Sequence, residues 1–252
     1  MKESVLLETQ RLTHVFPDGT IGIKDVNLRI YAGEFMVIAG TNGSGKSVLT
    51  RHLNGLLVPT EGEVLMDGMA IAKNIVKTRK RVGLIFQDSE SQFVGQTVEE
   101  EAAFGPENLG LPRSEIDQLV AQTLTSVGLS SVSNRNPYTL SGGQKRKLAV
   151  AGVLVMKPRL IIFDEPFTGL DYLGVVQVLN QLTRLHQQGH TIVVITHELE
   201  KVLAHAHRLV VMHQGKCVCD GKPEKILPLV EKYGIRNPLK NGGRIGELTW
   251  LS

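Results

Sequence analysis

The 252-residue chain has only two cysteines, Cys217 and Cys219, which are too few for a disulfide framework. Strand alternation would place both on one side, where they act as small hydrophobic residues in a reducing compartment. Aromatic residues make up 5% of the chain, and 28 basic residues nearly balance 25 acidic ones, for a net charge of +3. This small excess is compatible with a nucleotide, nucleic-acid or lipid partner and does not choose among them.

Long apolar runs are also missing. The longest, at 148–156 and 192–195, fall short of the ~18 to 20 residues that a helix needs to cross a bilayer. The N-terminus has only a three-residue apolar stretch after Glu3, where a signal peptide needs a longer one. We therefore expect a cytoplasmic protein without a membrane span. Its 42% hydrophobic content is enough for one large globular domain.

Four short apolar runs each stop at a glycine or a polar residue. The runs and the residues that follow them are 35–39 and Gly40, 82–86 and Gln87, 160–163 and Asp164, and 191–196 and His197. Continuous apolar stretches are typical of strands covered on both faces, as in a parallel sheet between helices. Any one polar end would suit a strand that simply reaches water. Together they favour a single site, because ligands bind beyond the carboxyl ends of such strands.

The N-terminal region follows a different pattern. Residues 26–30 alternate between apolar and polar, which predicts a strand with one wet face. We expect an antiparallel layer at about 3–32 and 61–72, packed on the α/β core.

A mainly helical insertion is expected at about 88–157. Apolar residues from Ile116 to Val127 follow a helical period behind Ser114 and Asp117, a pattern that resembles a capping box. Residues 223–252 form a C-terminal tail with one short amphipathic stretch and several turns.

Residues 40–47 read Gly-Thr-Asn-Gly-Ser-Gly-Lys-Ser, the Walker A form, between a predicted strand and a predicted helix. The glycines let backbone N–H groups point at phosphate oxygens, Lys46 neutralises the β- and γ-phosphates, and Ser47 offers an oxygen to Mg²⁺. The strand-turn-helix context disfavours the alternative, a glycine-rich turn with a solvated lysine. The predicted nucleotide-binding residues here are Asn42, Gly43, Ser44, Gly45, Lys46, Ser47 and Val48.

Asp164 and Glu165 form the Walker B arrangement at the end of an apolar strand. Adjacent carboxylates point in different directions, so Asp164 is predicted to face Mg²⁺ and Glu165 the attacking water as its base. His197 and Gln87 are predicted to complete the catalytic set, His197 at the γ-phosphate and Gln87 at the metal. Without the Walker A motif, all four would be interpreted as solvated strand ends.

Residues 140–144 read Leu-Ser-Gly-Gly-Gln and precede a helical stretch. Ser141 and Gln144 fit a capping box, whereas Gly142 and Gly143 leave the helix N-terminus open to an anion. Since the Walker A loop already holds its own nucleotide, this second anion-seeking helix end predicts a head-to-tail dimer that clamps two ATP molecules.

Taken in order, these motifs resemble the ATP-binding-cassette (ABC) ATPases over about residues 3–222. The resemblance implies the P-loop NTPase fold of that family, with residues 1–222 as the nucleotide-binding domain. It also implies that Phe16 stacks on adenine and that Asp171, in Gly-Leu-Asp, communicates between paired sites. Tyr172 stands where that family commonly has proline.

Residues 87–98 and 103–108 look like the ATPases of energy-coupling-factor importers of vitamins, cobalt or nickel. That resemblance implies a dimer with an identical copy or a homologue, a transmembrane scaffold subunit contacted by residues 88–108, and a separate membrane subunit that binds the solute. It places the protein at the cytoplasmic face of the cell membrane. For Gln92, Phe93 and Phe104 the alternative role is packing within the helical subdomain.

The rival class is a soluble ABC ATPase that acts on nucleic acid. Members of that class carry either a long coiled coil between the Walker A and signature motifs or two cassettes in one chain. This chain has neither feature. Its basic runs at 77–81 and 145–147 are short and suit solvated helix faces, so no nucleic acid is expected as a partner. A P-loop small-molecule kinase is disfavoured because it has no use for the motif at 140–144.

Overall fold

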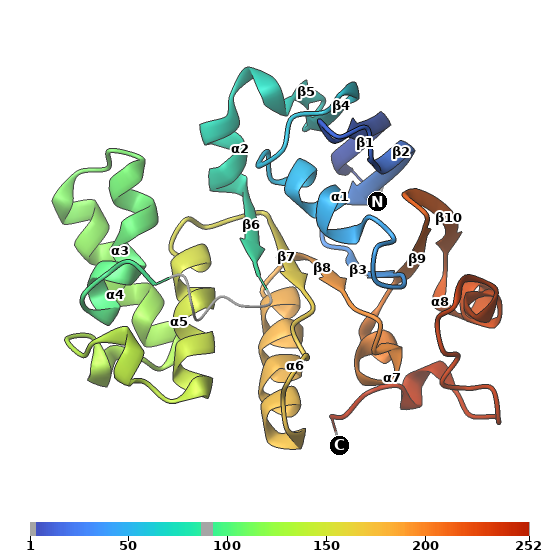
Figure 1. Ribbon diagram of the computed structural model, residues 1–252. Helices are drawn as coiled ribbons and strands as arrows, with labels where there is room; N and C mark the ends of the chain where they lie inside the picture. The colour runs from blue at the N-terminus through green and yellow to red at the C-terminus, as the bar shows by residue number, and fades with distance from the viewer. Residues whose placement is uncertain (1–3, 87–92, 252) are drawn as a thin grey trace.

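The computed structural model describes residues 4–86 and 93–251 and contains two β-sheets with helices around them (Figure 1). The first sheet is antiparallel, as predicted, in the order β2-β1-β4-β5. Its strands are β1 (Val5–Val15), β2 (Ile21–Tyr31), β4 (Glu61–Met66) and β5 (Met69–Ala70). Alternation in β2 buries Val26, Leu28 and Ile30 and leaves the residues between them exposed.

The second sheet forms the centre of the molecule, in the order β10-β9-β3-β8-β7-β6. Its strands are β3 (Phe35–Ala39), β6 (Val82–Ile85), β7 (Leu160–Asp164), β8 (Thr191–Ile195), β9 (Arg208–His213) and β10 (Lys216–Gly221). The pairs from β9 to β6 are parallel, and β10 pairs antiparallel with β9. Every residue of β3 and β8 is buried, which confirms the prediction of strands covered on both faces.

Alternate residues of β3 belong to two different apolar clusters. Met36 and Ile38 pack with residues of α1 (Lys46–Leu53) and of the antiparallel sheet. Val37 and Ala39 pack on the opposite face with α6 (Tyr172–Gln187) and α7 (Leu199–Val202). The sheet is therefore the middle layer between the antiparallel sheet and these helices (Figure 1).

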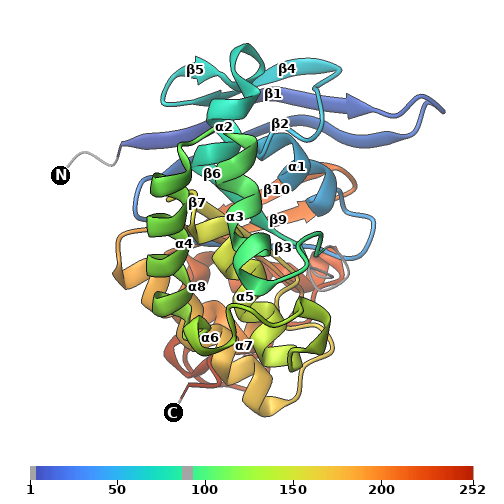
Figure 2. The same ribbon diagram turned by 90° about the vertical axis from the view of Figure 1, so that its left-hand side faces the viewer.

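The helical insertion has a core of its own. It contains α3 (Val98–Asn108), α4 (Arg113–Val127) and α5 (Gly142–Leu154), which share an apolar cluster. Figure 2 shows these helices in front of the six-stranded sheet. The expected cap of α4 is wrong: the helix starts at Arg113 after Pro112, so Ser114 already lies in its first turn, and Pro112 makes no side-chain cap.

The two cysteines do not share a side of β10, contrary to the expectation from strand alternation. A register shift lies between Cys217, which pairs with Met212, and Cys219, which pairs with Val211. The irregularity breaks the two-residue period, so Cys217 packs against the cluster of α1 and Cys219 against that of α6. Both remain free thiols, as expected.

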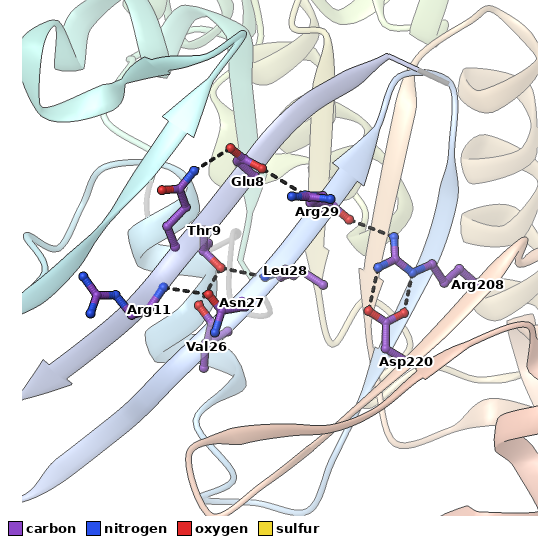
Figure 3. Close-up of polar contacts among 10 residues, drawn as sticks. Glu8, Thr9, Arg11, Val26, Asn27, Leu28, Arg29, Arg208 and Asp220 are labelled. Atoms are coloured by element: carbon purple, nitrogen blue, oxygen red, sulfur yellow. Dashed lines mark hydrogen bonds and ion pairs between the residues drawn. The ribbon is translucent and has the colours of Figure 1, made fainter. Parts of the chain in front are cut away.

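Arg208 connects the two sheets (Figure 3). Its guanidinium donates to Asp220 on β10 at 2.6 Å, to the carbonyl oxygen of Arg29 on β2 at 2.8 Å, and to Glu34 at 3.4 Å. Burial alone would lower the pKa of Arg208, but the hydrogen bonds and negative charges of Asp220 and Glu34 outweigh it and raise that pKa.

One further helix, α2 (Ile75–Arg81), lies near the antiparallel sheet (Figure 1).

The C-terminal residues pack on the domain. The tail begins with α8 (Pro223–Ile226) and continues in 3-10 turns at 227–233 and 245–247. Val230, Ile235 and Leu248 are buried in the cluster of α6 and α7. Over residues 4–86 and 93–251, no helix has the length and apolar character needed to traverse a bilayer.

Candidate nucleotide-binding and catalytic site

The motif residues come together beyond the carboxyl ends of β3, β8 and β7, which are neighbours in the sheet. The loop at 40–45 connects β3 to α1, and α1 begins after Gly45 with no side-chain cap on its N–H groups. A Cβ at Gly45 would lie 2.7 Å from the carbonyl oxygen of Gly22, and φ there is +97°. This position therefore requires glycine, and the bare helix end suits a phosphate group.

The ammonium group of Lys46 lies across the same loop. Its Nζ donates to the carbonyl oxygens of Gly40 at 2.8 Å and Thr41 at 3.0 Å. Burial lowers the pKa of Lys46, and the carboxylates of Glu165 and Asp164 act in the opposite direction. A buried cation beside a curled backbone is the arrangement that phosphate oxygens need.

Two carboxylates lie at the end of β7: Asp164 is its last residue, and Glu165 follows it. Burial raises the pKa of Asp164 and Glu165 raises it further, while Lys46, a hydrogen bond from Ser47 and the charge of Arg51 lower it. Glu165 has φ +49°, and its N–H donates to the carbonyl oxygen of Ile195 at 2.8 Å. A positive φ is uncommon outside glycine and marks the sharp turn of the chain at the end of the strand.

His197 lies next to Glu165. Its Nδ1 is 3.1 Å from Oε2 of Glu165, and the imidazole is more than half exposed whereas the carboxylate is 13% exposed. Thr196, to which the sequence analysis gave no role, fixes this turn: its N–H donates to Ile38 and its Oγ1 accepts from Glu198 N–H at 3.1 Å. The signal in the sequence was a polar threonine at the end of a largely apolar run, directly before His197.

The residues expected to hold Mg²⁺ fit that ion. Ser47 and Asp164 supply hard oxygen atoms, and Ser47 is near enough to lower the pKa of Asp164. Across the described ranges, no group of three or more His, Cys, Asp or Glu side chains could hold a metal. A magnesium ion that completes its shell with phosphate oxygens and water needs no such group.

The motif at 140–144 lies elsewhere, at the start of α5. Ser141 and Gln144 form the predicted capping box, with Ser141 N–H donating to Gln144 Oε1 at 3.1 Å and Gln144 N–H to Ser141 Oγ at 3.3 Å. Gly142 is exposed, and a Cβ on Gly143 would lie 3.1 Å from Oε1 of Gln177 on α6. None of these partners belongs to the phosphate loop of the same chain.

Asp171 and Phe16 lie at the ends of other elements, and one further predicted residue falls outside the described structure. Asp171 caps α6 by accepting from Gly174 N–H at 2.8 Å. Phe16 follows β1, and a Cβ on Gly22 would lie 2.9 Å from its ring and 3.2 Å from Val48 of α1. Phe16 is therefore beside the start of α1. Gln87 and residues 88–92 lie outside the described residues.

These features define a P-loop nucleotide-binding protein with an inserted helical subdomain. The family model described as ABC transporter matches residues 23–168, and the chain belongs to that family. It is an ATPase with the ABC fold.

Relatives and a solved structure agree with this assignment. The chain is 42% identical, over 92% of its length and 86% of the relative, to the energy-coupling factor transporter ATP-binding protein EcfA of Methanocaldococcus jannaschii. It is 47% identical to EcfA of Methanosarcina acetivorans, over 88% of this chain and 81% of that one. The structure of cbiO1 from Clostridium perfringens, described as part of the ABC transporter complex cbiONQ, matches with a TM-score of 0.80 at 34% identity, covering 94% of this chain and 97% of that one.

Proposed function

We propose that this ATPase energises a membrane importer of the energy-coupling-factor type, and two relatives named energy-coupling factor transporter ATP-binding proteins support this proposal. One observation carries the proposal: the two elements suited to bind phosphate, the loop at 40–45 and the start of α5, lie apart within this chain. Lys46 and the carboxylates meet at the strand ends, while the capped but exposed start of α5 has its contacts elsewhere. A second subunit, identical or homologous, supplies the missing half of each site.

In this mechanism each residue has a distinct task. The loop at 42–48 and Lys46 hold the triphosphate, Phe16 stacks on adenine, and Ser47, Asp164 and Gln87 hold Mg²⁺, which when bound neutralises phosphate charge. Glu165 takes a proton from the attacking water, and His197 hydrogen-bonds the phosphate. The glycine pair at 142–143, between Ser141 and Gln144, closes on the partner's ATP, and Asp171 connects the paired sites.

Closure has to reach the membrane through the helical subdomain, at the predicted contact 88–108. Within its described part, Glu101 Oε2 accepts from the N–H groups of Val94 at 2.7 Å and Gly95 at 2.9 Å, which fixes the loop before α3. Phe93 is buried, as the packing alternative predicted, whereas Val94 is 65% and Phe104 48% exposed. Tyr138, also exposed, donates to Phe93 O at 2.9 Å.

These exposed apolar side chains suit short helices of a transmembrane subunit at the cytoplasmic face of the membrane. A separate membrane subunit that binds the solute completes the proposed importer.

The test is to purify the chain from native membranes in mild detergent and to identify what accompanies it. We expect an integral membrane protein and a second ABC ATPase copy or homologue. The substitution Phe104→Asp should release the membrane protein while ATP binding remains. Met69→Glu is the matched control, because Met69 is an exposed apolar residue on β5, far from α3 in Figure 1.

Recovery with RNA or DNA in place of a membrane protein would favour the soluble nucleic-acid class instead. Equal recovery of the membrane protein with the Phe104 and Met69 variants would refute the proposed contact.

A further inference from the structure

Lys201, on α7, is a buried lysine to which the mechanism gives no task. It is 6% exposed, and its Nζ forms an ion pair with Glu198. The same ammonium lies 4.8 Å from the ring centroid of Trp250 and 5.8 Å from that of Phe167. A charge removed from water needs such partners, because an unpaired buried cation is strongly destabilising.

Each partner of Lys201 is next to a proposed catalytic segment. Phe167 follows Glu165 by two residues, and Glu198 directly follows His197. Trp250 stacks on Tyr172, the residue after Asp171, with ring centroids 5.7 Å apart and an interplanar angle of 29°. The Lys201 ammonium thus contacts the segments of Glu165 and His197. Trp250, its third partner, contacts the segment of Asp171.

The tail holds Trp250 in place through further contacts. Leu248 is buried, and its carbonyl oxygen accepts from Ala204 N–H at 3.0 Å. Thr249 Oγ1 lies 2.8 Å from His205 Nε2. The tail therefore packs directly on the turn that follows α7.

We propose that residues 248–251 form a positioning element for hydrolysis, which acts through Trp250 and Lys201 on the segments of Glu165, His197 and Asp171. The proposal rests on the proposed function, because it needs those residues to act on ATP. Trp250 and Lys201 are proposed as positioning residues and not as catalytic ones. Oε2 of Glu198 is buried without a hydrogen-bond partner, so the Lys201 ammonium provides its main compensation and any displacement is felt next to His197.

The experiment uses the complex purified from membranes and measures ATP hydrolysis, nucleotide binding and thermal unfolding for three variants. Trp250→Ala removes the ring, and Trp250→Phe keeps an aromatic face for the ammonium. Lys240→Ala is the matched control in the same tail, where an exposed lysine pairs with Glu231.

We expect Trp250→Ala to lower kcat about tenfold, equivalent to about 1.4 kcal/mol, with the KM for ATP within about twofold of the wild type. Trp250→Phe should restore most of kcat, and Lys240→Ala should match the wild type.

The inference is overturned if Trp250→Ala keeps the wild-type kcat, or if it loses nucleotide binding and thermal stability in the same proportion as activity. It is also overturned if Trp250→Phe is as slow as Trp250→Ala. A wild-type complex that hydrolyses no ATP would instead refute the proposed function, which keeps the two failures distinct.

Discussion

The imidazole of His197 lies against the carboxylate of Glu165, with Nδ1 3.1 Å from Oε2, although 32 residues separate them in the chain. The contact follows from sheet order, since β7 and β8 are adjacent parallel strands and both side chains follow the strand ends. The side chains proposed to act on the attacking water and on the phosphate therefore form one hydrogen-bonded pair.

Glu165→Gln should abolish ATP turnover while it leaves ATP binding intact. The amide keeps the size of the side chain and loses the basic oxygen, so we expect kcat to fall by about 10²- to 10⁴-fold. Phosphate release measures the loss, and nucleotide binding measured on the same preparation provides the control. Undiminished hydrolysis would refute the role proposed for this carboxylate.

Gly143→Ala should impair hydrolysis without weakening the fold. Alanine favours helix over glycine, and its methyl group would meet only the amide end of Gln177 at 3.1 Å. The same methyl would stand where the partner's phosphate is proposed to bind, so we expect at least about a tenfold lower kcat. Gly152→Ala is the control on the same helix, because nothing lies within 4 Å of the added atom. Equal activity of the two variants would contradict the proposed clamp.

Arg208→Ala should destabilise the protein by about 3 kcal/mol near neutral pH, because Glu34 would remain buried without its cation. Arg29→Ala is the matched control on the same network (Figure 3): its side chain is 63% exposed, so loss of its pair with Glu8 should cost at most about 1 kcal/mol. Denaturant unfolding measures both changes. Similar losses for the two variants would show that Arg208 does not connect the sheets energetically.

The Arg208→Ala defect should also depend on pH. Burial raises the pKa of Glu34, and the hydrogen bond from Tyr31 and the charge of Arg208 oppose the rise. Without Arg208 the folded-state pKa rises further above the unfolded value. Between those two values the folded state binds more protons, so stability falls as pH increases. The defect should therefore be smaller at about pH 5 than at about pH 8, and a pH-independent defect would contradict this account.

The buried side chain of His52 is expected to make the stability of the fold sensitive to acid. It is fully buried on α1, and burial and the nearby His14 lower its pKa to about 4, although the Leu57 backbone acts in the opposite direction. The unfolded chain binds a proton near the usual value of 6.5, so stability contributed by the neutral ring is present above that pH and is lost as pH falls towards 4. We expect a loss of about 3 kcal/mol over this interval. His52→Leu should remove that part of the pH dependence, and an unchanged slope would refute it.

The sequence predicted the parts of the fold that depend on short patterns. The strands before Gly40 and Asp164 form as expected, because continuous apolar runs must be covered on both faces. The capping box of Ser141 and Gln144 also forms. The ABC family follows from the order of these motifs.

Contacts between distant segments could not be predicted in the same way. Nothing in the pattern around Lys201 indicates that Trp250, 49 residues later, covers its ammonium group. The opposite packing of Cys217 and Cys219 depends on an irregular register with β9, which neighbouring residues do not specify. The cap at Ser114 failed because Pro112 starts α4 earlier, with its ring fixing the entry of the chain.

The strand that leads into the phosphate loop is held from both sides. Met36 and Ile38 anchor it to one apolar cluster, and Val37 and Ala39 anchor it to the other. Interiors this well packed transmit small volume changes as displacements. We therefore expect that loss of a methyl group in either layer can alter affinity for ATP through the packing of this strand, without a change in any binding residue.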